Sequence, residues 1–144
     1  MRTITHIIVH CSANKAGSAL RMADIDRIHR TQNGWDSCGY HYVIPTDGTI
    51  EPACPEEQPG AHCRGHNRHS IGVCYIGGLA PDGHTPADTR TPAQRRALAL
   101  LIRQLRTRYP QARVVGHQDM DPRKPHCPGF SVAEEYEDPL GPPV

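Results

Sequence analysis

Three short apolar runs constrain the fold of this chain more than any other feature. They lie at residues 3–9, 70–76 and 112–116 and are rich in Ile and Val, which favour the pleated surface of a β-sheet. None of them approaches the roughly 20 apolar residues that a membrane-spanning helix needs. The runs therefore predict short buried strands, and they give no indication of membrane insertion.

Two amphipathic helices are expected between the strands. The clearer one spans 92–108, where Thr91 is a good N-cap and Gln94 completes a capping box. Its apolar side chains recur at the spacing of one helix face: Leu98, Leu101, Ile102 and Leu105. A second helix is predicted over 22–32, and Asn33-Gly34 would end it.

A β-hairpin is expected between the first helix and the second apolar run. Residues 40–44 and 49–51 have strand composition, and Asp47-Gly48 between them is a strong turn signal. Helices therefore alternate with strands along the chain. The fold class that this order predicts is α/β, a single domain with a central mixed β-sheet flanked by helices.

The length of 144 residues suits one domain with one core. We assign residues 1–132 to that domain and 133–144 to an acidic, Pro-rich C-terminal tail, and we expect the chain to fray from residue 131 onward. A net charge of +1, with one Trp, one Phe and five Tyr, argues against a nucleic-acid partner.

The N-terminus lacks the pattern of a secretory signal peptide, because its apolar stretch is short and no small-residue cleavage site follows. We therefore expect the protein to be cytoplasmic when synthesised. In that compartment the six cysteines are expected as thiols rather than disulfides. A Cys54–Cys63 bridge stays open as an alternative.

Two histidines and one cysteine stand where a metal site would need them. His10 closes the first apolar run, His117 closes the third, and Cys127 follows ten residues later in a Pro-flanked loop. Two imidazoles and one thiolate suit Zn²⁺, and three protein ligands leave the fourth tetrahedral position for water. The pattern predicts a small metallohydrolase with one zinc ion per chain.

Five segments match a known family in the right order. They are Ile8-Val9-His10-Cys11-Ser12-Ala13, Gly39-Tyr40-His41-Tyr42, Gly60-Ala61-His62, His69-Ser70-Ile71-Gly72-Val73 and Cys127-Pro128-Gly129-Phe130. Together they resemble the zinc-dependent N-acetylmuramoyl-L-alanine amidases of the amidase-2 type, which include phage endolysins and peptidoglycan recognition proteins. The resemblance runs from about residue 5 to 132.

The resemblance implies a substrate and a setting. The enzymes of this family hydrolyse the amide bond between N-acetylmuramic acid and L-alanine in bacterial peptidoglycan. The lack of a signal peptide and of a wall-binding module suits a phage or prophage endolysin, which reaches the cell wall of the host after release. A monomer is the expected state.

The resemblance also assigns roles to individual residues. His10, His117 and Cys127 match the zinc ligands, and Tyr40 matches the active-site tyrosine. Two acidic side chains that follow His117 would be candidates to orient its ring from the second layer of the site, Asp119 and Asp121.

One catalytic position departs from the family pattern. The enzymes commonly carry a lysine two residues before the ligand cysteine, and Pro125 stands there in this chain. Lys124 is our candidate for the catalytic cation, with His126 as the alternative. His62 and Asn67 match the loop that forms the substrate-binding wall in the family.

Two other classes of function remain to be compared. A non-catalytic peptidoglycan-binding module would keep the fold, but some such modules replace the ligand cysteine, whereas Cys127 is present here. A cysteine hydrolase would use Cys11 or Cys38 with a histidine base. His66 and His69 are expected to make only hydrogen bonds within their loop.

Overall fold

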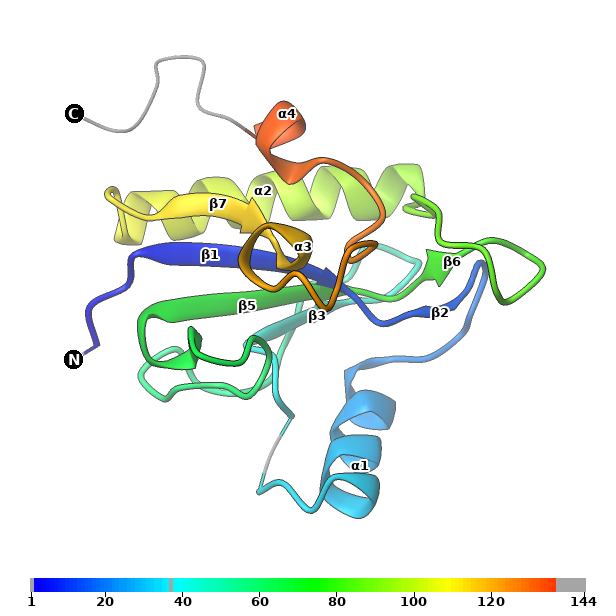
Figure 1. Cartoon of the computed structure of the whole chain (residues 1–144), viewed down its shortest axis with the longest axis horizontal. Coiled ribbons are helices and arrows are strands. Elements are labelled where there is room, and N and C mark those ends of the chain that lie inside the picture. The colour runs from blue at the N-terminus through cyan, green and yellow to red at the C-terminus, as the bar shows by residue number, and fades with distance from the viewer. Residues whose placement is uncertain (1, 37, 137–144) are drawn as a thin grey trace.

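The computed structural model describes residues 2–36 and 38–136. A mixed five-stranded sheet in the order β4-β3-β5-β1-β7 forms the centre of the molecule, and a two-stranded sheet of β2 and β6 lies beside it (Figure 1). The elements in chain order are β1 (His6–Cys11), β2 (Asn14–Lys15), α1 (Met22–Gln32), β3 (Tyr42–Ile44), β4 (Glu51–Pro52), η1 (Asn67–His69), β5 (Ser70–Tyr75), β6 (Gly78–Leu79), α2 (Pro92–Arg108), β7 (Arg113–Gly116), α3 (His117–Met120) and α4 (Val132–Tyr136).

Strand β1 holds the position that decides where the site forms. It pairs in parallel with β5 on one side and with β7 on the other. Because side chains alternate along a strand, Ile7 and Val9 face one side of the sheet, whereas Ile8 and His10 face the other. The first side is covered by α2, so His10 points to the opposite side.

Helix α2 and the sheet enclose the main core. Leu98, Leu101 and Leu105 pack in one cluster with Ile7 and Val9 of β1 and with apolar residues of β5. The helix has the predicted bounds, and its capping box forms: the Gln94 amide N–H donates to Thr91 Oγ1, 3.0 Å away, and the Thr91 amide N–H donates to Gln94 Oε1, 2.9 Å away. The prediction for 92–108 is confirmed.

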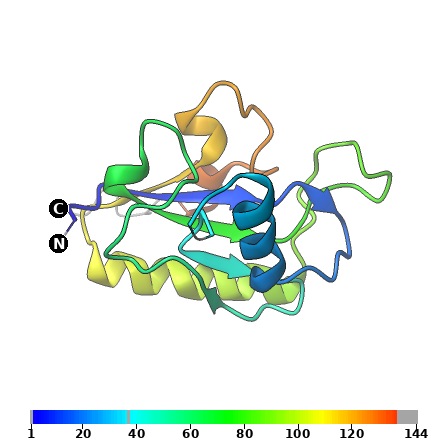
Figure 2. The ribbon, with the colours of Figure 1, turned by 90° about the horizontal axis from the view of Figure 1, so that it is seen from below.

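Helix α1 lies on the other side of the sheet from α2 (Figures 1 and 2). It also has the predicted bounds, Met22–Gln32. Ile25 packs there in a smaller cluster with Cys38, Val43 and Ile76. His10 points to the side of the sheet that carries α1, so the two helices divide the molecule into a core side and a site side.

The hairpin is confirmed, but its strands are shorter and shifted. β3 and β4 pair antiparallel with Val43 opposite Glu51. The return strand starts later than predicted because the Thr49 amide N–H donates to Asp47 Oδ1 within the turn, 2.9 Å away. Tyr40 makes its backbone bond to the loop instead, since its carbonyl accepts from the Cys54 N–H.

The expectation that the chain frays from residue 131 is wrong for the described part of the tail. Val132 is fully buried at the start of α4. Glu135 forms an ion pair with the buried Arg90, whose guanidinium also lies 3.4 Å from the centroid of the Phe130 ring. These contacts hold 131–136 on the domain, and residues 137–144 lie outside the described residues.

Two further expectations concern disulfide bonds and membrane-spanning helices. Cys11, Cys63, Cys74 and Cys127 are thiols, so the alternative Cys54–Cys63 bridge is not formed. Within the part of the chain that the structure describes, no helix combines the length and the apolar composition that crossing a membrane requires.

Candidate metal centre

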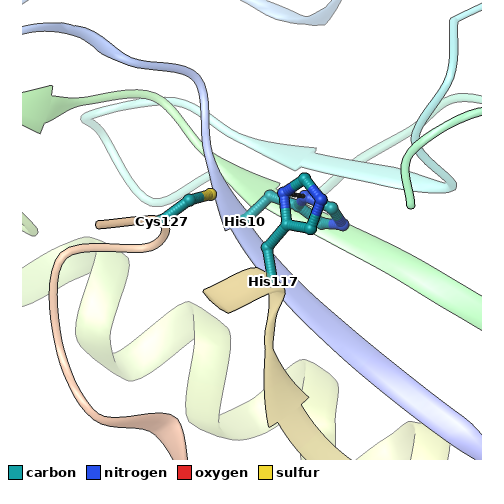
Figure 3. A group of neighbouring side chains, drawn as sticks. All are labelled: His10, His117 and Cys127. Carbon is teal, nitrogen blue, oxygen red and sulfur yellow. Dashed lines mark hydrogen bonds between the residues drawn. The ribbon is translucent and has the colours of Figure 1, made fainter. Parts of the chain in front are cut away.

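His10, His117 and Cys127 converge at the carboxyl end of β1. One ligand atom from each lies within 4.8 Å of the other two, and His10 Nδ1 is 3.1 Å from His117 Nδ1 (Figure 3). Figure 3 shows the two imidazoles close together with the Cys127 sulfur turned toward them. Two nitrogens and one sulfur at this spacing form a group able to hold a metal ion.

His10 is fixed by the sheet and is almost completely buried, at 1% exposure. Burial lowers the pKa of its imidazole, and the neighbouring His62 and His117 lower it further. The ring is therefore neutral at physiological pH. Neutral imidazole is the form that binds a metal.

His117 follows β7 directly and opens the short helix α3. Asp119 and Asp121, the two residues proposed to orient its ring, make different contacts. The carboxylate of Asp119 accepts from the Gly116 amide N–H at 2.8 Å and so caps α3. Asp121 Oδ2 lies 4.0 Å from His117 Nε2, beyond a direct hydrogen bond, and Arg123 donates to the same carboxylate.

Cys127 reaches the site from a loop, where backbone and side chains of other elements hold it. The Cys11 amide N–H donates to Cys127 Sγ at 3.3 Å, and the two sulfurs are 3.8 Å apart. The Gln118 amide N–H donates to the Cys127 carbonyl at 2.8 Å. The sulfur is therefore placed by β1 on one side and by α3 on the other.

Tyr40 lies against the same group. The centroid of its ring is 5.1 Å from that of His10. Burial raises the pKa of the phenol well above its ordinary value, and the nearby Cys74 and Cys127 raise it further, so the Tyr40 side chain is neutral.

His62 lines the groove beside the metal-binding group and also contacts His10. It is 8% exposed, and its Nδ1 lies 2.8 Å from His10 Nε2 while its Nε2 lies 3.1 Å from Ser70 Oγ. Burial lowers its pKa to about 3. The ring fits because residue 72 is a glycine: a Cβ there would stand 2.5 Å from His62 Cγ. Sequence reasoning missed this contact, since no local pattern joins position 62 to position 10.

A groove of about 450 Å³ opens beside the metal-binding group. Its lining residues come mainly from the 61–67 loop and the 117–124 segment, and they include Trp35, His62, Arg64, Asn67, His117 and Lys124. Lys124 is also close enough for its charge to lower the pKa of His10 and His117. His126 is exposed, and among the described residues it does not belong to the groove lining.

Asn67 lines this groove but uses its side-chain oxygen inside the loop. Asn67 Oδ1 accepts from the amide N–H groups of His62 and Cys63, both at 2.9 Å. The residue therefore fixes the turn that carries His62.

The geometry disfavours a cysteine hydrolase. Cys38 is 2% exposed, and burial raises the pKa of its thiol to about 11, whereas a nucleophilic cysteine needs a lowered pKa. The Cys11 sulfur lies against Cys127 and not beside a histidine base in the described hydrogen bonds.

The protein is thus a helix-covered mixed sheet with a His-His-Cys group beside a groove. The chain belongs to the N-acetylmuramoyl-L-alanine amidase family, whose model matches residues 1–130. The endolysin of Klebsiella phage KP32 is 38% identical over 133 residues, which is 92% of this chain and 85% of the phage protein. The endolysin of Escherichia phage T7 is 37% identical over 131 residues, covering 91% and 84% of the two chains.

A solved structure agrees with this assignment. The N-acetylmuramoyl-L-alanine amidase LysC from Clostridium intestinale has a TM-score of 0.76 and 29% identity, covering 93% of this chain and 82% of LysC. The expected family and fold are confirmed. The protein is a hydrolase, a peptidoglycan amidase of the endolysin type.

Proposed function

We propose that the enzyme cleaves the N-acetylmuramic acid–L-alanine amide with one Zn²⁺ held by His10, His117 and Cys127. The observation that carries this proposal is the convergence of the three ligand atoms within 4.8 Å. Two imidazole nitrogens and one thiolate are ligands that zinc favours, and three of them leave one position open. When bound there, zinc would lower the pKa of a coordinated water and polarise the scissile carbonyl.

The protein groups around the ion supply the remaining chemistry. Tyr40, a neutral phenol whose ring lies against that of His10, would donate a hydrogen bond to the oxygen of the carbonyl under attack. Lys124 lies on the groove side of His117. Its cation would stabilise the same developing negative charge and supply a proton to the departing amine.

His62 and Asn67 act on the site through its supports. His62 contacts the ring nitrogen of His10 that does not face His117, so it would set the orientation of the His10 ring. Asn67 holds the loop of His62 and forms part of the groove wall in which the muramyl peptide would lie. We infer a positioning role for His62 and a substrate-binding role for the Asn67 wall.

The biological setting is inferred from the relatives. The endolysin relatives support a phage or prophage enzyme that acts on the host cell wall. We infer that it is made inside the host and acts after release as a monomer. The non-catalytic alternative has no comparable support, because the ligand cysteine is present and lies at the site.

The test is hydrolysis of purified peptidoglycan by metal-stripped protein, with and without added Zn²⁺. We expect zinc to restore the release of free L-alanine amino termini without new reducing sugar ends. Cys127→Ala should bind no zinc and stay at least about a hundredfold less active, since even outer-shell changes cost tenfold to a hundredfold. His84→Ala, at an exposed position, is the matched control and should behave as the wild type. Zinc-independent cleavage by Cys127→Ala would overturn the proposal.

The catalytic cation can be assigned with two variants. Lys124→Met should lower kcat by about a hundredfold, the lower range for a proton-transfer group, with little change in zinc affinity. His126→Ala should change neither quantity, since His126 is not among the described residues that line the groove. A large loss of kcat in His126→Ala alone would reverse the assignment.

A further inference from the structure

Three further histidines gather at the opposite end of β1 from the metal centre. His6 begins β1, His66 precedes η1, and His69 ends η1. His66 Nδ1 lies 3.3 Å from His69 Nε2, and the rings of His6 and His69 are 5.8 Å apart between centroids. His6 precedes His10 by four residues of extended strand, about 13 Å at the usual rise. The cluster is therefore separate from the site described above.

The spacing of the two closest nitrogens is that of a chelate. Zinc–imidazole bonds of about 2.0–2.1 Å at a tetrahedral angle put two ligand nitrogens about 3.3 Å apart. We propose that His66 Nδ1 and His69 Nε2 bind a second divalent transition-metal ion, with His6 turning in as a third ligand and water filling the remaining positions. All three side chains are partly exposed, so an ion can reach them from solvent.

The backbone of the two chelating residues is held in place before any ion binds. The Ser70 hydroxyl donates to the His66 carbonyl at 2.7 Å, and the Thr5 amide N–H donates to the His69 carbonyl at 2.8 Å. His6 Nδ1 lies 2.8 Å from Thr5 Oγ1, which leaves its Nε2 for the ion. Burial lowers the pKa of His6, and the nearby His69 and His66 add to the shift, so its ring is neutral and able to coordinate.

The surroundings select the kind of metal. The described cluster offers imidazole nitrogens and no carboxylate, and the cation of Arg113 lies close enough to lower the pKa of His6. Ca²⁺ and Mg²⁺ require oxygen ligands. Imidazole suits Zn²⁺, Ni²⁺ and Cu²⁺, so these are the ions that the site would take.

Binding of a metal ion at this site would also affect the 62–70 segment. The Ser70 hydroxyl that bonds the His66 carbonyl also contacts His62 Nε2 at 3.1 Å. An ion bridging His66 and His69 therefore closes a ring that includes η1 and Ser70. Because an ion that binds only the folded state stabilises it, we expect added Ni²⁺ to raise the Tm.

The experiment counts metal ions and does not depend on amidase activity. Zinc-loaded protein is equilibrated with Ni²⁺ by dialysis, and both metals are measured per chain in the same sample. The wild type should gain one nickel while keeping its zinc, and the double variant His66→Gln/His69→Gln should lose that one equivalent. His84→Gln, which removes an exposed histidine elsewhere, should keep it.

Each result has a definite meaning. Weaker nickel binding in His6→Gln, with the stoichiometry retained, would support the third ligand. Equal nickel uptake by the wild type and the double variant would overturn the proposal, as would no uptake by the wild type. Unchanged circular dichroism would show that the double variant is folded. If the double variant does not fold, the rise in Tm caused by Ni²⁺ is measured on the single variant His66→Gln instead. A missing zinc equivalent would contradict the proposed catalytic site and leave this one unaffected.

Discussion

The two halves of the metal centre are built in different ways. His10 belongs to a strand hydrogen-bonded on both sides, and the three residues before it are fully buried. Cys127 belongs to a loop whose residues 122–126 are exposed. The first ligand is fixed by a backbone ladder, and the second is fixed by a few side-chain contacts. Single side-chain changes should therefore disturb the loop half far more easily than the sheet half.

The contacts that hold the loop half lie just after Cys127. The Tyr75 hydroxyl donates to the Pro128 carbonyl at 2.6 Å, and Gln118 Nε2 donates to the Phe130 carbonyl at 3.1 Å. The Phe130 ring rests on Arg90, whose guanidinium binds Glu135 and Asp88. The comparison can thus be tested one anchor at a time.

The largest effect on stability is expected from Arg90→Met. The Arg90 side chain is fully buried, and its removal leaves Asp88 and Glu135 without their main partner. We expect a loss of about 3 kcal/mol in the free energy of unfolding, at the low end for a broken buried pair because both carboxylates are partly exposed. Urea unfolding measures it, and zinc affinity should fall as well. The control Arg95→Met removes an exposed partner of Asp88 and should cost less than about 1 kcal/mol; equal losses would contradict this account.

The sheet half has one weak point, at Gly72. A methyl group there would meet the His62 ring, so Gly72→Ala should cost about 1–3 kcal/mol, as overpacking does, and should displace the ring that contacts His10. Thermal unfolding and zinc affinity are the measurements. In a His62→Ala background the same substitution should cost much less. If the cost persists there, the strain lies in the strand and not in the imidazole.

A smaller effect is expected from Tyr75→Phe. It removes one hydrogen bond and leaves the Pro128 carbonyl without its donor, which should cost about 1–2 kcal/mol and weaken zinc binding. Tyr109→Phe removes a comparable hydroxyl contact, to Glu56, far from the site. That control should lose stability without losing zinc affinity. Loss of zinc affinity in both variants would show that the loop is not a separate unit.

The smallest effect is the acid dependence of the Arg90 anchor. The Arg90 hydrogen bond lowers the pKa of Glu135, and the Arg90 hydrogen bonds also lower the pKa of Asp88 against an opposing effect of burial. Carboxylates with lowered pKa values stabilise the fold above their unfolded pKa, near 4, and lose that contribution as pH falls through the folded pKa. Stability measured between pH 5 and 2 should therefore fall less steeply in Arg90→Met than in the wild type.

Much of the fold could be predicted because it depends on local patterns. Both main helices have the predicted bounds, since caps and i, i+3, i+4 spacing are properties of neighbouring residues. The strands were predicted but their first and last residues were not, because a strand ends where its hydrogen bonds to the neighbouring strand end. The helix at 132–136 was missed for a related reason: its stability comes from Arg90, 45 residues away in sequence.

The candidate site likewise combines residues that local sequence patterns predict with a contact that they do not. His10 and His117 could be expected together because each follows an apolar run, and the carboxyl ends of parallel strands meet at one edge of a sheet. The contact of His62 with His10 had no such signal. It depends on the space left by Gly72 on a strand that is adjacent only in the folded molecule.

The sequence by itself determined the alternation of strands and helices, the apolar face of the 92–108 helix, and the three candidate ligands. These follow from hydrophobic periodicity and from motifs that are local in the chain. Only the tertiary structure decided that Cys127 Sγ lies beside the Cys11 amide, that His62 supports His10, and that Arg90 holds the segment after Cys127. Such contacts join residues 40 or more positions apart, so packing and not local propensity selects them.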